Sequence, residues 1–271
     1  MLAPCVFLVG LDAFVTVPLV PAIAADTGIP PDLGALLVTA YALAYAISAP
    51  LFGAISDRAG RKNVICLGAL VLGVGTVLTG LGGTLTGLLL LRAVTGVGAG
   101  MLQPGVFAYV GDKVPYAARG RAMGTILASM SSATVLGVPV GAYLAGLGSW
   151  RWPFWAIGLL ALLILLAVAL LLPKDAPGSE ATGDPVASML GRFRSALSAP
   201  SIPFALLASF LWFGSLQGTF ANVGLFYARG FGLGTAQIGL ILAAAGLGTV
   251  AGGALGGRLA DRWGKRAVTA G

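Results

Sequence analysis

Two charged side chains, Asp12 and Arg92, lie inside long apolar segments of a chain in which only 9% of the residues are charged. Placing a charge at the centre of a bilayer costs at least about 2.5–3.5 kcal/mol, so such residues usually face a partner or a cavity. A carboxylate changes its affinity for a proton when a guanidinium approaches or leaves it. We therefore predict that Asp12 and Arg92 form a proton-binding pair, with a static pair that fixes helix packing as the alternative.

The segments that carry this pair are long enough to cross a membrane. Hydrophobic residues make up 58% of the chain and its mean hydropathy is +0.96. A membrane-spanning helix needs about 20 apolar residues, and a barrel is excluded because the segments do not alternate in polarity. At 1.5 Å per residue, the depths of Asp12 and Arg92 differ by about 7 Å, which an arginine side chain can span. Eight helices are predicted, at residues 2–24, 33–55, 64–83, 85–110, 122–147, 152–172, 202–228 and 235–257.

Basic residues in the connections orient the chain, because cytoplasmic loops carry an excess of Lys and Arg. One set of alternate connections holds only Arg151 and Arg229. We therefore predict a multi-pass protein of the cell (inner) membrane with a cytoplasmic N-terminus. The predicted cytoplasmic connections hold Arg58, Arg61, Lys62, Lys113, Arg119, Arg121, Lys174, Arg192, Arg194, Arg258, Arg262, Lys265 and Arg266.

One long polar stretch, 173–200, is rich in Pro, Gly and Ser and predicts a cytoplasmic linker. It divides the chain into a six-helix transmembrane bundle at 1–172 and the start of a second bundle at 201–271. Its part "VASMLGRFRSAL" is predicted either as an amphipathic helix on the membrane surface or as a disordered tether.

Composition excludes several classes of function. The net charge of +7 does not indicate nucleic-acid binding, because the basic residues lie at the ends of apolar segments. Cys5 and Cys66 lie within apolar segments and are interpreted as small hydrophobic residues. The chain has no histidine, so neither a metal site nor a cofactor is expected. With one embedded carboxylate, an enzyme is not expected either.

A charged sequence, "GAISDRAGRK" at 53–62, recurs as "GGRLADRWGKR" at 256–266. Small residues let helices approach closely in membranes, and an aspartate can pair with basic side chains or with a helix N-terminus. The alternative is that the charges only fix topology. The matching residues are Gly53 with Gly257, Asp57 with Asp261, Arg58 with Arg262, Gly60 with Gly264, Arg61 with Lys265 and Lys62 with Arg266.

The two copies resemble the signature that the major facilitator superfamily carries between helices 2 and 3 and, in weaker form, between helices 8 and 9. The resemblance implies an all-α integral membrane protein with a six-helix N-terminal bundle and the first two helices of a C-terminal bundle. Since the family has twelve helices, the chain is expected to be truncated after helix 8. The resemblance also implies that the motif is a conformational latch. Asp112 is the expected partner of Arg61, because it lies at the cytoplasmic end of the fourth predicted helix.

Two further segments resemble motifs of this family. "LLLLRAVTGVGAG" is similar to the helix-4 motif, although Thr95 stands where the family often has Gln. "LGVPVGAYLAG" at 136–146 is similar to the helix-5 motif of proton-driven exporters, in a form where Val138 separates the glycine from the proline. With "SWRWPFWAIG" after it, this segment is most similar to the twelve-helix drug and sugar efflux permeases, which are proton antiporters. The matching residues are Arg92, Gly96, Gly98 and Ala99, then Gly137, Pro139, Gly141 and Gly146.

The resemblance implies a secondary active transporter in which Asp12 and Arg92 couple proton movement to efflux of small amphipathic molecules, drugs or sugars, by alternating access. The expected partners are a small-molecule substrate, protons and the lipid bilayer, and the expected state is a monomer. An uptake permease for a sugar or other nutrient, and a non-transporting scaffold or sensor, are the alternatives. The resemblance implies that helices 1, 4 and 7 line the substrate cavity. The residues on these helices that we expect to face it are Gln103, Phe213, Gln217, Phe220 and Asn222, and the alternative is that they only pack helices together.

Overall fold

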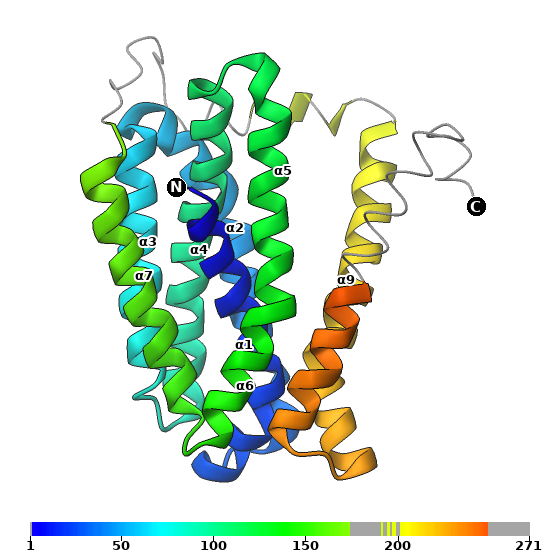
Figure 1. Cartoon of the computed structure of the whole chain (residues 1–271). Helices are drawn as coiled ribbons and strands as arrows, with labels where there is room; N and C mark the ends of the chain where they lie inside the picture. The colour runs from blue at the N-terminus through cyan, green and yellow to red at the C-terminus, as the bar shows by residue number, and fades with distance from the viewer. Residues whose placement is uncertain (1, 174–190, 192–193, 196, 199–200, 249–271) are drawn as a thin grey trace.

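The chain is described by a computed structural model over residues 2–173, 191, 194–195, 197–198 and 201–248. Within these residues the secondary structure is helical and contains no strand. The long helices stand side by side along one common direction (Figure 1). This arrangement confirms the predicted all-α class.

Short connections join successive helices at two opposite ends of the bundle (Figure 1). The upper end, as drawn there, carries the connections at Gly60 and at residues 114–115, and the lower end carries those at 28–34, 80–84 and 147–150. A further helix, Thr235–Gly248, follows α9. The helices in chain order are α1 (Ala3–Thr27), the short η1 (Pro31–Leu33), α2 (Ala35–Ala59), α3 (Arg61–Thr79), α4 (Leu85–Lys113), α5 (Tyr116–Ser132), η2 (Ala133–Gly137), α6 (Val138–Gly146), α7 (Arg151–Leu171) and α9 (Ser201–Phe231).

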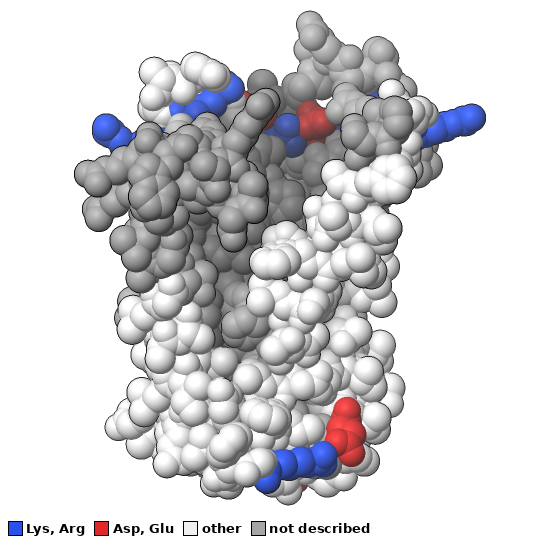
Figure 2. Space-filling model, turned by 90° about the vertical axis from the view of Figure 1, so that its right-hand side faces the viewer, with Lys and Arg blue, Asp and Glu red and all other residues white. Residues whose placement is uncertain are grey.

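Five of the described helices are long and apolar enough to cross a membrane: α1, α2, α3, α4 and α7. On the face of the molecule in Figure 2, Lys, Arg, Asp and Glu lie near the top and bottom edges, and the described surface between them carries none. Apolar side chains such as Ile47, Leu163 and Leu170 are exposed. An exposed apolar belt between two charged ends fits a protein whose surroundings are lipid acyl chains.

The helix ends differ from the predicted spans by several residues. The span predicted at 33–55 continues to Ala59, and the span predicted at 64–83 begins at Arg61 and ends at Thr79. Gly60 alone separates the two helices, with φ 86° in the left-handed region that glycine adopts without strain. Asp57 and Arg58 therefore lie in the last turn of α2, and the charged motif is a helix–turn–helix corner.

Helix α4 packs between α2 and α3 through glycines on two of its faces. A methyl group at Gly98 would lie 2.5 Å from the amide nitrogen of Leu72 on α3, and one at Gly96 would overlap the carbonyl oxygen of Tyr41 on α2. Likewise, a methyl group at Gly68 of α3 would lie 2.8 Å from the amide nitrogen of Leu102. Such close approach of two backbones is common where membrane helices pack through small residues.

The predicted fifth helix is one helical segment interrupted by a π-helical turn. That turn, η2, ends at Gly137, and Pro139 occupies one of the first two positions of α6. A proline inside a continuous α-helix removes a hydrogen bond and collides with the preceding turn, whereas it is tolerated at the start of a helix. The π turn interrupts the regular α-helical hydrogen bonding before Pro139, so the proline lies at the start of α6 and not inside a continuous α-helix.

Most of the buried apolar side chains form one core shared by α1 to α4, α5 and α7. A smaller cluster joins this bundle to the later helices: Val17 of α1 and Val38 of α2 pack with Ile238 and Leu242. The predicted division at 1–172, 173–200 and 201–271 remains a prediction, because most of 174–200 and all of 249–271 lie outside the described residues.

The cluster lies toward the lower end, where α9 meets α1 (Figure 1). There a methyl group at Gly224 of α9 would overlap the carbonyl oxygen of Val17. Pro21 has no N–H, so this carbonyl lacks the partner that a regular helix would supply four residues on. At the rim, Arg229 Nη1 lies 2.7 Å from Asp32 Oδ1. These contacts close the lower end between the two parts of the chain.

Candidate functional site

Asp12 and Arg92 form an ion pair inside the helical bundle. The Nη1 atom of Arg92 lies 2.8 Å from Oδ2 of Asp12, and the side chains are 1% and 0% exposed. Arg92 Nη2 also donates to the main-chain oxygen of Asp12 at 3.1 Å. The guanidinium therefore holds both the carboxylate and the backbone of one residue of α1, and joins α1 to α4.

Neighbouring helices complete the surroundings of this pair. Thr76 Oγ1 on α3 donates to Asp12 Oδ1 at 3.0 Å. The guanidinium carbon of Arg92 lies 4.5 Å from the ring centroid of Tyr41 on α2, within the range of a cation–π interaction. The Tyr41 hydroxyl in turn donates to the main-chain oxygen of Val9 at 3.3 Å. Four helices thus contribute to the surroundings of one buried ion pair.

Two buried polar atoms in this part of the bundle have no hydrogen-bond partner among the described residues: Nε of Arg92 and Oγ1 of Thr16. Thr16 is four residues after Asp12 and so lies on the same face of α1. Each such atom would gain free energy by meeting water. The chemistry of the site therefore suits hydration.

The first copy of the repeated motif forms a charged cluster at the upper end. Arg61 pairs with Asp57 one turn back across the Gly60 corner, and its Nε lies 3.0 Å from Asp112 Oδ2 at the end of α4. It also donates to Ser56 Oγ and to the main-chain oxygen of Gly53. One guanidinium thereby ties the ends of α2, α3 and α4 together.

Lys62 acts on a different helix. Its Nζ donates to the main-chain oxygens of Ala169 at 2.7 Å and Leu172 at 2.5 Å, so it caps the end of α7. A cation at a helix C-terminus is favourable because the last carbonyls lack partners and the helix dipole is negative there. Arg58 is half-buried in the last turn of α2, where the same dipole effect applies.

The rest of the predicted latch is only partly described. A methyl group at Gly53 would meet nothing within 4 Å in the described part of the chain, so no close helix contact is seen there. The second copy of the motif lies outside the described residues, at Gly257, Asp261, Arg262, Gly264, Lys265 and Arg266.

The predicted cavity residues do not share one surface among the described side chains. Gln103 is buried within the bundle, where its Oε1 accepts from the Tyr45 hydroxyl at 3.1 Å. Phe213 and Asn222 are exposed on α9, and Asn222 donates to the main-chain oxygen of Gly218 on its own helix. The side chains of Gln217 and Phe220 lie outside the described residues. Gln103 thus links α2 and α4 in this conformation.

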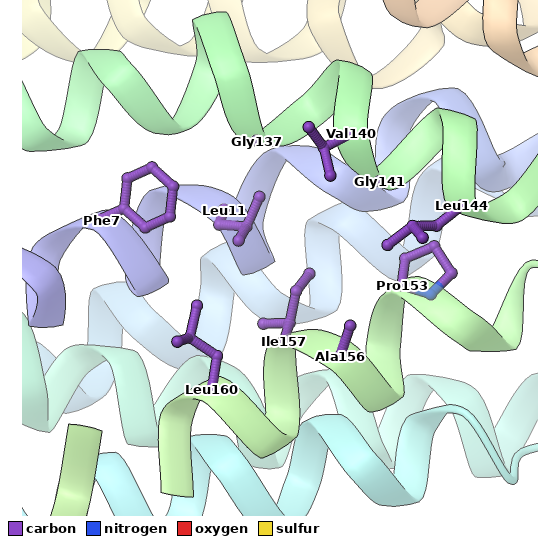
Figure 3. Close-up of a pocket in the computed structure, with 10 residues that line it drawn as sticks. All are labelled: Phe7, Leu11, Gly137, Val140, Gly141, Leu144, Pro153, Ala156, Ile157 and Leu160. Atoms are coloured by element: carbon purple, nitrogen blue, oxygen red, sulfur yellow. The ribbon is translucent and has the colours of Figure 1, made fainter. Parts of the chain in front are cut away.

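The helix-5 motif contributes to an apolar pocket of about 250 Å³ between α1, α6 and α7 (Figure 3). A methyl group at Gly137 would overlap Leu11 of α1, and one at Gly141 would overlap Val15. These glycines therefore let α1 lie directly against η2 and α6. The pocket offers no polar side chain that could orient a ligand, since its lining consists of Phe7, Leu11, Gly137, Val140, Gly141, Leu144, Pro153, Ala156, Ile157 and Leu160.

Tyr41 and Thr76 were not among the residues singled out from the sequence. Both are neutral and lie in apolar segments where hydroxyl side chains are common, so their residue type did not indicate that they contact the charged pair. Helical spacing could have found Thr76 only once its helix was known to face Asp12. A charged residue in lipid stands out by itself, whereas its neutral partners do not.

The fold and this buried charge pair define a polytopic membrane protein, and comparison with known proteins gives its family. The chain matches the Major Facilitator Superfamily over residues 2–271 and belongs to this family. Members of the family are transporters and not enzymes, in agreement with the expectation from the sequence.

The chain is similar to the uncharacterized MFS-type transporter YwfA of Bacillus subtilis (strain 168). The two are 31% identical over 260 residues, which cover 96% of this chain and 63% of YwfA. It is also 32% identical over 179 residues to the quinolone resistance protein NorA of Staphylococcus aureus (strain N315), covering 66% of this chain and 45% of NorA. The chain thus spans less than two thirds of the length of these relatives.

Solved structures agree on the fold. A bacterial homologue of the human lysosomal transporter Spinster, in an inward-facing and unoccupied conformation, has a TM-score of 0.75 and 21% identity, covering 98% of this chain and 62% of that one. The D-xylose–proton symporter has a TM-score of 0.74 and 18% identity, covering 96% and 68%. At these identities the likeness is one of fold, and it confirms the predicted architecture.

Proposed function

We propose that this chain acts in secondary active transport, exporting small amphipathic molecules in exchange for protons by alternating access. Family membership supports transport, and the quinolone resistance protein NorA among the relatives favours export. The observation that carries proton coupling is the Asp12–Arg92 pair, buried at 2.8 Å between two membrane-spanning helices. In this proposal the protein is a monomer of the cell membrane with its N-terminus, and hence its upper end, in the cytoplasm.

Burial gives the pair a physical link between proton binding and conformation. While Asp12 is ionised, its charge offsets that of Arg92. Once Asp12 is protonated, the guanidinium is left as an uncompensated buried charge, a change that costs several kcal/mol in proteins. The bundle lowers this cost by letting α1 and α4 shift until water or substrate reaches Arg92. Protonation of Asp12 thereby favours one conformation and deprotonation the other.

Asp12 cannot exchange protons with water in the conformation described, because its side chain is 0% exposed. Exchange requires the bundle to open, and Thr16 Oγ1 and Arg92 Nε supply polar atoms that water could bind as it enters. The contacts at the lower end and the Arg61 cluster at the upper end are the two places where the proposed cycle would open and close the protein.

Replacing Asp12 with Asn tests the proposal. Purified protein reconstituted into liposomes would be given a quinolone, ethidium or D-xylose while a pH-sensitive dye reports the internal pH. We expect Asp12→Asn to reduce substrate-driven proton movement by at least about a hundredfold, since the exchanging group is gone. Asp26→Asn is the matched control: Asp26 pairs with Arg151 at the lower end of α1, outside the buried pair. It should retain transport within about threefold, as expected for a partly exposed ion pair.

Each outcome separates the proposal from its alternatives. Full proton coupling in the Asp12→Asn protein would remove Asp12 from the mechanism. Val138, which separates Gly137 from Pro139, departs from the exporter motif and favours an uptake permease as the second candidate. Accumulation of D-xylose driven by an inward proton gradient would support that candidate. If none of the three compounds moves protons through the unmodified protein, proton-coupled transport of these compounds is refuted, and the scaffold or sensor gains support.

A further inference from the structure

The Asp12 carboxylate has one partner for each of its oxygens. Oδ2 accepts from Arg92 at 2.8 Å, and Oδ1 accepts from Thr76 Oγ1 at 3.0 Å. Thr76 is completely buried and comes from α3, whereas Arg92 comes from α4. The two partners therefore fix the orientation of the carboxylate from two different helices.

These two partners differ in what they can do when Asp12 changes its protonation state. A guanidinium only donates hydrogen bonds, whereas a hydroxyl both donates and accepts. Toward the ionised carboxylate, Thr76 donates to Oδ1. Toward a carboxyl protonated on Oδ1, Thr76 accepts from the new O–H group. Its own hydroxyl hydrogen can then turn to the main-chain carbonyl of Leu72, four residues earlier, as threonines in helices commonly do.

Thr79 shows that this turn is available on the same helix. It lies one turn after Thr76, is equally buried, and donates its hydroxyl to the main-chain oxygen of Gly75 at 2.8 Å. Between these two buried threonines of α3, Thr76 directs its hydroxyl at another helix and Thr79 at its own backbone. The orientation of Thr76 is therefore set by Asp12 and not by a general preference of threonine.

We propose that Thr76 is the positioning residue of the proton site: it holds Asp12 Oδ1 in both protonation states, so that the proton is added to and removed from a fixed oxygen. This inference deepens the proposed function and rests on it for its role in coupling. The proton comes from water admitted when the bundle opens and returns to water on the other side. Thr76 neither gains nor loses a proton; only its hydroxyl hydrogen changes acceptor. Among the residues that the structure describes, the charged and titratable groups that face Asp12 are Arg92 and Tyr41.

Two substitutions at Thr76 separate the hydroxyl from the volume of the side chain. Val keeps the volume and loses the hydroxyl, and Ser keeps the hydroxyl and loses a methyl group. If the hydroxyl positions Asp12, Thr76→Val should lower substrate-driven proton movement about tenfold, as the loss of one buried hydrogen bond to a charged group does, while Thr76→Ser stays within about threefold of the original. Thr79→Val is the matched control and should behave like Thr76→Ser.

An infrared readout tests the same point without any substrate. The stretching bands of the Asp12 carboxylate are identified as those that disappear in Asp12→Asn. They should shift in Thr76→Val and stay in place in Thr76→Ser and Thr79→Val, because the hydrogen bond at Oδ1 is lost only in the first. If Thr76→Val does not assemble in the membrane, Thr76→Ala and Thr76→Ser form the equivalent pair, since both are smaller than Thr and only one has a hydroxyl.

The reverse order of effects overturns the inference. A role in packing predicts that Val is tolerated and Ser is harmful, with the Asp12 bands unchanged in Val. Bands and proton movement that are the same in all variants would overturn it as well. If the unmodified protein moves no protons with any of the three compounds, the proposed function fails, while the infrared bands still decide whether Thr76 positions Asp12.

Discussion

At the scale of single residues, the arginine at position 92 does more than supply a positive charge. It donates to the carboxylate and to the main-chain oxygen of Asp12, and its guanidinium carbon lies 4.5 Å from the centroid of the Tyr41 ring. A lysine ammonium cannot make this set of contacts, because it lacks the planar fork of donors. The residue type is therefore fixed by geometry as well as by charge.

A double-mutant cycle on this pair gives a second test at the residue scale. Arg92→Met leaves Asp12 as a buried charge without its ion partner and should lower the free energy of unfolding by about 3–5 kcal/mol. Asp12→Asn with Arg92→Met removes both charges and should be more stable than Arg92→Met alone by at least about 1 kcal/mol. Titration with sodium dodecyl sulfate measures these two variants and Asp12→Asn alone, which completes the cycle. Strictly additive effects would contradict an ion pair at 2.8 Å.

The sequence was informative about this site because charge in lipid is conspicuous. Asp12 and Arg92 could be paired from their depths along two helices, and Asp112 could be matched to Arg61 from its position at a helix end. The hydroxyls of Tyr41 and Thr76 could not be found in this way, because which face of α2 and α3 meets α1 depends on how the whole bundle packs. Hydropathy gave the membrane helices but misplaced their ends by up to about six residues, since charged residues extend helices beyond the apolar core.

At the scale of helices, glycines decide how closely α4 can approach its neighbours. Gly98 faces the backbone of α3 and Gly96 faces the backbone of α2. Backbone atoms cannot move aside as flexible side chains do, so an added methyl group must push the helices apart. Since α4 carries Arg92, such a displacement would also move the guanidinium away from Asp12.

Gly98→Ala tests this packing. Overpacking a well-filled core typically costs about 1–3 kcal/mol, and the same detergent titration should show a loss of this size. Gly111→Ala on the same helix is the matched control, because a methyl group there meets nothing within 4 Å in the described part of the chain. Alanine is the better helix former by up to about 1 kcal/mol, so Gly111→Ala should be neutral or slightly stabilising. Equal losses in both variants would contradict the close-packing explanation, because a methyl group at Gly111 meets nothing within 4 Å in the described part of the chain.

At the scale of the whole molecule, closure of the lower end depends on how tightly α9 docks against α1. Gly224 presents a bare Cα to the Val17 carbonyl that Pro21 leaves without a helical partner. A Cα–H group can make a weak hydrogen bond to such a carbonyl. The exposed Asp32–Arg229 pair at the rim adds little by comparison, because exposed ion pairs contribute about 0–1 kcal/mol.

Gly224→Leu should therefore hold the lower end open. Ile238 is completely buried in the closed cluster, so a cysteine placed there, in a background without Cys5 and Cys66, reports opening. A membrane-impermeant maleimide added outside the cell should label it at least about fivefold faster in Gly224→Leu, since a clash of about 1–3 kcal/mol shifts the equilibrium by about fivefold or more. Gly214→Leu, where a methyl group meets nothing in the described residues, should not change the labelling rate. Unchanged labelling in Gly224→Leu would show that this contact does not control closure.

The one-residue corner at Gly60 has a mechanical consequence. Because Gly60 alone joins α2 to α3, a tilt of the first turn of α3 at the membrane surface is carried along that helix. Tyr41 lies on α2 and Thr76 on α3, the latter about 24 Å from Gly60 at 1.5 Å per residue, and they contact Arg92 and Asp12 respectively. A displacement at the Arg61 cluster can therefore reach the Asp12–Arg92 pair along α3, which contains no proline, whereas Pro50 interrupts the hydrogen bonding of α2 between the corner and Tyr41.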